Sequence, residues 1–198
     1  VIYPIVMGWQ WGGGWLTSIG FSDFAGSTLV HSTGGAAALA GIMILGPRFG
    51  RFTKSGVPTP IKQFAASSIP LVTIGVFVLW LGWFGFNGGS QLALGSFTDA
   101  VSISTIFINT NLAACGGVLA AAVITRLMFG KTDVIQMLNG AIGGLVAITA
   151  EPLAPSPLSA ILIGAVGGMI VVFGTKLLFS YKLDDVVGAI PAHLFSGI

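Results

Sequence analysis

The sequence predicts an all-α fold, a polytopic transmembrane helical bundle with inverted-topology repeats. Of its 198 residues, 54% are hydrophobic and only 7% are charged, and the mean hydropathy is +0.95. Soluble domains contain about 25% charged residues, so this composition indicates an integral membrane protein in a lipid bilayer. Thirty glycines indicate closely packed helices, because lipid provides no hydrophobic drive for helix association. A net charge of +2 predicts no nucleic-acid partner.

Five complete apolar spans are predicted, with an incomplete span at each end. Their approximate bounds are residues 23–46, 65–88, 101–129, 134–150 and 158–179. The apolar opening stretch and the residues after Asp185 are both shorter than the roughly 20 residues that cross a bilayer. The chain also begins without an initiator Met or a signal peptide. We therefore expect residues 1–198 to be one transmembrane domain that is truncated at both ends.

Basic residues distinguish the two faces of the predicted bundle. All eight lie after the first span, after the third span, or at the end of the fifth span and beyond: Arg48, Arg51, Lys54, Lys62, Arg126, Lys131, Lys176 and Lys182. The loops at residues 89–100 and 151–157 contain no Lys or Arg. The positive-inside rule makes the basic side cytoplasmic. We therefore predict a multi-pass protein of the cell membrane, meaning an inner or plasma membrane. Its first span enters from outside and its final partial span enters from inside.

One polar element occurs twice, near opposite ends of the chain. The spacing Asp-x2-Gly-x4-His-x3-Gly is shared by two sets of residues: Asp23, Gly26, His31 and Gly35, and Asp185, Gly188, His193 and Gly197. Because the two copies enter from opposite faces, they indicate an inverted repeat. Eight helical residues rise about 12 Å, so both imidazoles approach the midplane of a hydrocarbon core about 30 Å thick. The alternative is two unrelated histidines, each hydrogen-bonded into helix packing.

The acidic residues of the repeat have a structural explanation. Asp23 and Asp185 precede helical segments, where a carboxylate can accept hydrogen bonds from free backbone N–H groups. Asp184 fits the same capping role. Attraction of a cation by Asp23 is a secondary effect in this interpretation.

Aromatic side chains gather near the predicted outer face. They are Trp9, Trp11 and Trp15 around the glycines at 12–14, and Trp80, Trp83, Phe84 and Phe86 ahead of Asn87 and Ser90. Aromatic residues at this depth usually form an interfacial belt. Aromatic faces beside a hydroxyl also bind a small cation, at about 0.5–2 kcal/mol per face.

Three ordered segments resemble a known family. The segments DFAGSTLVHSTGGAAAL, LGWFGFNGGS and LDDVVGAIPAHLFSG, together with WGGG, resemble hallmark sequences of the ammonium transporter family (Amt/Mep/Rh), nearer its Amt/Mep branch. The resemblance implies nitrogen uptake by transport of ammonium or ammonia, with methylammonium as an analogue, through a narrow hydrophobic pore. It also implies a homotrimer, no cofactor and no enzymatic activity. Many bacterial relatives bind a PII-type regulatory protein at the cytoplasmic face.

The resemblance assigns roles at the outer end of the pore. Trp11 matches the tryptophan of the outer ammonium-recruitment site, and Ser90 matches its hydroxyl partner. Phe86 matches one of two phenylalanines that close the pore below that site. The other has no counterpart in residues 1–198. Asp23 matches the acidic residue beneath the recruitment site.

The resemblance also identifies His31 and His193 as the paired histidines of the pore. This chain has Val187 and Gly188 where many relatives carry a Cys-Asp pair, and Pro191 lies two residues before His193. Proline removes a backbone donor and can bend the helix beside the site. The expected effect of these departures is on local geometry and regulation rather than on transport.

Desolvation gives the implied mechanism a physical basis. A bare ammonium ion in a narrow apolar pore loses more hydration energy than a few aromatic contacts return, whereas neutral ammonia does not meet that barrier. In this hypothesis Trp11 and Ser90 select the cation, and Phe86 gates it. The His31–His193 pair accepts a hydrogen bond and relays a proton. Imidazole suits this task because its ordinary pKa is about 6.5.

Two other functions are compatible with parts of the pattern. One is an ammonium sensor or transceptor, the membrane domain of a larger signalling protein. The other is a membrane enzyme with a di-histidine metal centre, but the sequence shows no third conspicuous ligand. Cys115 has no placed partner and is expected to be a small packing residue. We therefore predict neither a metal site nor an enzyme.

Overall fold

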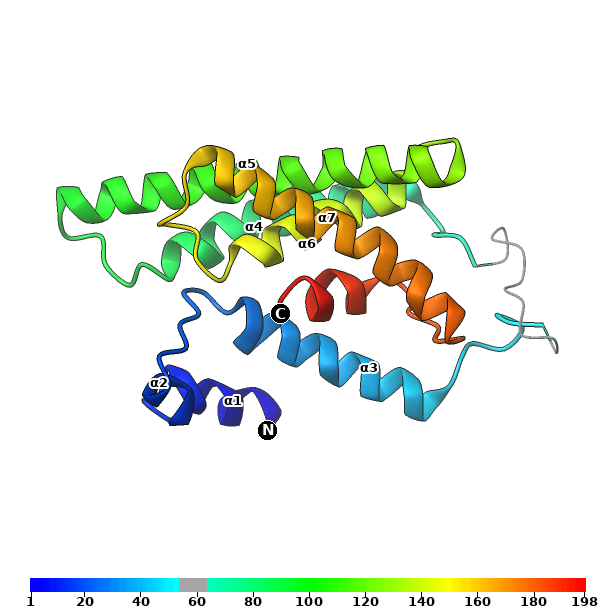
Figure 1. Cartoon of the computed structure of the whole chain (residues 1–198), viewed down its shortest axis with the longest axis horizontal. Coiled ribbons are helices and arrows are strands. Elements are labelled where there is room, and N and C mark those ends of the chain that lie inside the picture. Colours follow the sequence, from blue (N-terminus) through cyan, green and yellow to red (C-terminus); the bar gives the residue numbers. More distant parts are fainter. Residues whose placement is uncertain (54–63) are drawn as a thin grey trace.

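The computed structural model describes residues 1–53 and 64–198, and the described chain is an assembly of helices (Figure 1). In chain order the helices are α1 (Ile2–Gln10), α2 (Trp15–Ser18), η1 (Ser27–Ser32), α3 (Thr33–Leu45), α4 (Ile69–Gly89), α5 (Phe97–Phe129), α6 (Val134–Ile148), α7 (Pro157–Ser180) and η3 (Ile190–Phe195). The predicted all-α transmembrane class is confirmed. Lys54 and Lys62, which the sequence places on the cytoplasmic side, lie outside the described residues.

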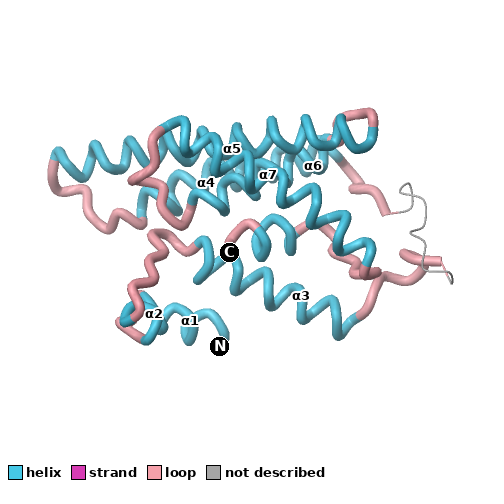
Figure 2. Tube along the Cα trace, viewed as in Figure 1, coloured by secondary structure: helices cyan, strands magenta, loops and turns pink. Residues whose placement is uncertain are grey.

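The helices form two groups with η3 between them. Helices α5, α6 and α7 pack tightly against one another, and α4 lies against α5 and α6. Helices α1, α2 and α3 form the second group, and η3 contacts α3 on one side and α6 and α7 on the other (Figure 2). The end of α3, the α5–α6 connection and the end of α7 lie at the same end of the molecule (Figure 1). Gathering of these basic segments at one end is what the predicted orientation requires.

Four helical segments in the described chain are long and apolar enough to cross a membrane. They are η1 with α3 (Ser27–Leu45), α4, α5 and α7. The fourth predicted span, α6, is apolar but has only 15 residues, fewer than the roughly 20 that cross a bilayer. Its side chains are largely buried between α5 and α7.

Helices α4 to α7 each begin at a residue whose side chain accepts a backbone N–H bond: Ser68, Ser96, Asp133 and Ser156. At α5 the bond is reciprocal, because Asp99 also accepts from the backbone N–H of Ser96. This capping box starts α5 at Phe97, four residues before the predicted start at Val101. Local capping therefore sets helix starts that hydropathy alone places only approximately.

Small residues allow α5, α6 and α7 to meet at backbone contact. A Cβ atom added at Gly164 of α7 would overlap the backbone of Ala113 in α5, and one added at Gly117 of α5 would overlap the carbonyl of Gly140 in α6. Such close approach maximises van der Waals contact between helices in lipid. The glycine-rich composition thus has a direct structural use in this three-helix core.

Replacing Gly164 with alanine is expected to lower thermal stability, because the added methyl group meets a backbone that cannot move aside. Overpacking of this kind costs about 1–3 kcal/mol. Thermal melting in detergent measures the effect. The control is Gly82→Ala in α4, where an added Cβ meets nothing within 4 Å and where alanine raises helix propensity. Equal melting temperatures for both variants would contradict the proposed packing.

An ion cluster joins the segment after α3 to the segment before η3. Asp184 accepts hydrogen bonds from Arg48 Nε at 2.7 Å and Arg48 Nη2 at 2.8 Å, and Arg51 Nε lies 3.3 Å from it. Arg51 is 7% exposed, and its guanidinium also faces the rings of Phe64 and Phe179. The capping role predicted for Asp184 is therefore wrong, because its carboxylate is occupied by two arginines that are distant in sequence.

Replacing Asp184 with asparagine is expected to destabilise the protein at pH 7 and to have little effect in acid. The hydrogen bonds from Arg48 lower the pKa of the Asp184 carboxyl below its ordinary value of 3.8, against the opposing effect of burial. A carboxyl whose pKa falls on folding stabilises the protein above its unfolded pKa and loses that contribution as the pH falls through the folded pKa.

At pH 7 the variant leaves the buried Arg51 uncompensated, which costs about 3 kcal/mol. The melting-temperature difference between wild type and variant should shrink as the pH falls below about 4. A difference that stays constant from pH 7 to pH 3 would show that the charge of Asp184 is not what stabilises the cluster.

Candidate functional site

The first copy of the repeat is a capped turn. The carboxylate of Asp23 accepts four backbone hydrogen bonds from residues 26–29, each 2.9 Å long. Gly26 has a φ of 109°, which a side chain would disfavour. Asp23 is 1% exposed, so its charge is balanced chiefly by these N–H groups and by the positive end of the helix. The predicted capping role of Asp23 is confirmed.

The second copy forms the same turn. Asp185 Oδ1 accepts from Gly188 N and Ala189 N at 3.0 Å, and its Oδ2 accepts from Ile190 N at 2.7 Å. Gly188 has a φ of 80°. The capping role of Asp185 is confirmed as well, and the shared spacing corresponds to a shared local structure.

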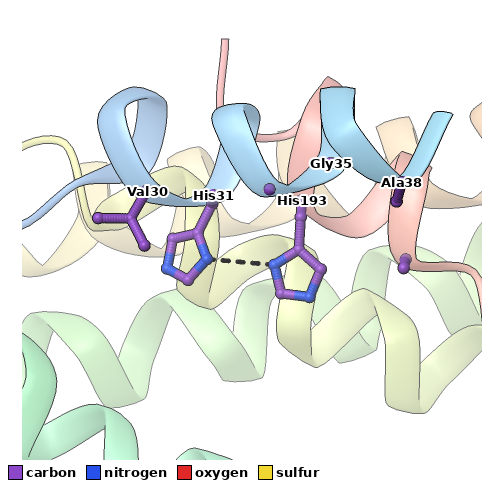
Figure 3. A pocket seen from close by; sticks show the side chains of 7 residues that line it. Val30, His31, Gly35, Ala38 and His193 are labelled. Carbon is purple, nitrogen blue, oxygen red and sulfur yellow. Dashed lines mark hydrogen bonds between the residues drawn. The ribbon is translucent and has the colours of Figure 1, made fainter. Parts of the chain in front are cut away.

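Each capped turn leads into a π-helix that carries one histidine. His31 lies in η1 and His193 in η3. Their Nδ1 atoms are 3.2 Å apart and their ring centroids are 5.1 Å apart (Figure 3). One Nδ1 must donate and the other accept, so the two rings have different tautomers or one is protonated. The two imidazoles do meet, as the inverted repeat predicts.

Two glycines allow the histidine-bearing helices to cross. Gly35 follows His31 by four residues, and a Cβ atom there would lie 2.5 Å from the backbone nitrogen of Leu194. Gly197 follows His193 by four residues, and a Cβ atom there would overlap the carbonyl of Ser27. The final glycine of each copy of the repeat is therefore a point where the two helices cross.

Aromatic rings cover His31. Trp83 stacks on it at a centroid distance of 4.8 Å and an angle of 17°, and Phe86 is tilted against it at 5.4 Å. Trp83 is 6% exposed. Trp83 was predicted to belong with the other aromatic residues of the interfacial belt, and its contact with His31 was not predicted. The available signal was its position three residues before Phe86, on the same helical face.

The histidine pair borders a cavity of about 240 Å³. Its lining is small and apolar apart from the two imidazoles (Figure 3), and consists of Val30, His31, Gly34, Gly35, Ala38, Ala189 and His193. His31 Nε2 is buried and has no hydrogen-bond partner within the described residues. An imidazole nitrogen in apolar surroundings is a site where a small polar molecule can be bound.

The predicted outer residues are placed by backbone hydrogen bonds. Trp11 Nε1 donates to the carbonyl of Asp23 at 2.9 Å, which holds its ring near Gly26. Ser90 Oγ donates to the carbonyl of Phe86 at 2.8 Å. The proton of Ser90 is thus occupied and its lone pairs remain available. Across the described ranges no hydrogen bond or ring contact joins Trp11 to Ser90.

The described residues bring no third metal ligand to the histidine pair. Within residues 1–53 and 64–198, no three His, Cys, Asp or Glu side chains gather at metal-binding distance. Cys115 is a free cysteine on α5 and is exposed within the described residues.

Comparison with known proteins identifies the family. A profile of the Ammonium Transporter Family matches residues 1–198. The chain belongs to this family. Among curated family members, it is 47% identical to ammonium transporter Amt2 of Archaeoglobus fulgidus, with 100% of the chain and 43% of the relative covered. It is also 47% identical to the putative ammonium transporter sll1017 of Synechocystis, with 100% of the chain and 44% of the relative covered.

Solved structures of the family have the same arrangement. One described as a "Sensor Amt Protein" superposes with a TM-score of 0.92 at 36% identity, covering 100% of the chain and 49% of that protein. The crystal structure of Candida albicans Mep2 superposes with a TM-score of 0.86 at 33% identity, covering 100% of the chain and 42% of that protein. The chain spans less than half the length of the curated relatives named here, and these relatives are transporters rather than enzymes.

Proposed function

We propose that residues 1–198 are part of a longer transporter subunit, truncated at both ends, that moves ammonium or ammonia across the cell membrane. The observation that carries this proposal is the histidine pair. Two imidazoles 3.2 Å apart border a small apolar cavity between helices of opposite direction. Such a cavity rejects a hydrated cation, because the desolvation of a charge costs far more than that of neutral ammonia.

We assign the six site residues the roles that membership of the ammonium transporter family implies. Trp11 and Ser90 bind the cation at the outer end, and the carboxylate of Asp23 adds attraction beneath them. Phe86, which covers His31, gates the passage. His31 and His193 accept hydrogen bonds from the substrate and pass its proton between them. The occupied proton of Ser90 supports its role, because its lone pairs are left to face a cation.

Assembly and regulation extend this proposal. We infer a homotrimer of complete subunits in the inner or plasma membrane, with a PII-type protein binding at the cytoplasmic face. The membership of the chain in the family supports both statements. Chemical cross-linking in membranes and a pull-down with the PII-type protein under nitrogen-replete conditions test them separately.

Reconstitution of the full-length protein tests transport. Ammonium-evoked current and methylammonium uptake into proteoliposomes are expected to saturate with substrate concentration and to resist competition by potassium. Empty liposomes are the control. Saturable binding without current or uptake would overturn transport.

That last result would favour an ammonium sensor. One observation supports this second function: the solved structure that superposes with a TM-score of 0.92 is described as a sensor. A signalling domain attached to the full-length chain would favour it further.

A further inference from the structure

Thr149, at the end of α6, is hydrogen-bonded both to α4 and to the turn that precedes η1. Its hydroxyl oxygen accepts a hydrogen bond from Trp83 Nε1 at 2.8 Å. The hydroxyl also lies 2.6 Å from the carbonyl of Leu145 and 3.2 Å from Asn87 Oδ1, the two acceptors available to its proton. The backbone carbonyl of Thr149 accepts from Ala25 N at 3.1 Å. One fully buried residue thus connects α4 to the capped turn that begins η1.

The hydrogen bond from Trp83 limits how its ring can move. The indole has one polar atom, Nε1, and that atom is bound to Thr149. Turning the ring over would carry Nε1 away from the hydroxyl and leave a buried donor unpaired, which is unfavourable. The side chain of Trp83 is therefore held in one orientation by a residue that does not itself contact His31 through any described hydrogen bond or ring contact.

The held indole supports the His31 ring. Trp83 stacks on His31 at an interplanar angle of 17°, and the ring planes of His31 and His193 differ by 27°. In this arrangement Nδ1 of His31 faces His193, while Nε2 is free of a partner within the described chain. A tilt of the Trp83 face would tilt the imidazole and lengthen the contact between the two Nδ1 atoms.

We propose that Thr149 is a positioning residue for the histidine pair: through Trp83, its hydroxyl sets the ring orientation that directs His31 Nδ1 at His193 and leaves His31 Nε2 free to bind substrate. This inference rests on the proposed transport function. Thr149 acts through the indole and takes no part in recruitment of the cation at the outer end.

The experiment compares Thr149→Val, Thr149→Ser and wild type in the full-length protein. Valine keeps the shape and removes the hydroxyl, and serine restores the hydroxyl. In proteoliposomes Thr149→Val is expected to lower the maximal ammonium-evoked current at least fivefold and to weaken rejection of potassium. The half-saturating ammonium concentration should change less than twofold. Thr149→Ser should recover wild-type current and selectivity.

Thr125→Val is the matched control. Thr125 is equally buried and its hydroxyl also bonds within its own helix, but it lies at the other end of α5 from the cap and has no described contact with Trp83. This variant should retain wild-type current. Equal losses in Thr125→Val and Thr149→Val would show a general cost of removing buried hydroxyls and would overturn the inference. So would wild-type current and potassium rejection in Thr149→Val.

Experimental structures of the wild type and Thr149→Val separate this inference from the proposed function. The expected change is a turned Trp83 indole and an Nδ1–Nδ1 distance beyond about 3.5 Å, outside hydrogen-bond range. An unchanged Trp83 and histidine pair would overturn the positioning role whatever the transport result. A wild type without current or uptake would count against the proposed function alone, and the two structures would then decide the role of Thr149.

Discussion

Replacing His31 with alanine in the full-length protein is expected to abolish saturable ammonium transport while leaving the protein folded. The change removes the partner of His193, 3.2 Å away, and the ring on which Trp83 stacks. A positioned proton-transfer group contributes about 10²–10⁴-fold to a rate, so residual saturable transport should be at most about one hundredth of the wild-type rate. Binding at the outer end should persist, because Trp11 is held by Asp23 rather than by the histidines.

Replacing either histidine with an acidic residue tests the proton relay more specifically than alanine does. In His31→Asp or His193→Glu a carboxylate still accepts a hydrogen bond but favours an intact cation. Discrimination against potassium should therefore weaken, measured as competition against ammonium-evoked current in proteoliposomes. If the wild type and all three variants give the same current and the same rejection of potassium, the histidines are packing residues and the relay is wrong.

Replacing Asp23 with alanine is expected to cause the largest loss of stability. Its carboxylate accepts four backbone N–H bonds at the start of η1, three buried and one partly buried, and each unpaired buried donor costs about 1–3 kcal/mol. The sum is comparable to the net stability of a typical domain, about 5–15 kcal/mol. Asp23→Ala should therefore melt at a much lower temperature or fail to accumulate in membranes.

Asparagine at the same position separates capping from cation attraction. Asp23→Asn keeps one oxygen acceptor and turns the other into a donor that faces two N–H groups, so its melting temperature should lie between those of wild type and alanine. The control is Asp99→Asn at the exposed capping box of α5, where water can replace the lost hydrogen bond and the melting temperature should change little. A variant Asp23→Asn with wild-type melting but weakened ammonium binding would show that the charge serves recruitment more than structure.

Several features of the fold were predictable because they depend on short stretches of chain. The start of α7 at Pro157 lies one residue from the predicted start, and Ser156, the side chain that caps it, is its immediate neighbour. Each capped turn of the repeat uses an aspartate, a glycine with positive φ and the N–H groups between them and the helix, all within seven residues. Hydropathy then identifies the apolar helices that follow.

The sequence by itself determined the membrane class, the inverted repeat and the convergence of His31 and His193, since composition, spacing and helical rise are properties of the chain in order. Only the tertiary structure decided that Trp83 backs His31, that Thr149 holds Trp83, and that Asp184 pairs with arginines instead of capping a helix. Thr149 and Asp184 reach partners more than 60 residues away in the chain, and Trp83 reaches His31 across 52. Contacts of that kind depend on how α3, α4, α6 and η3 pack, which no local pattern of residues specifies.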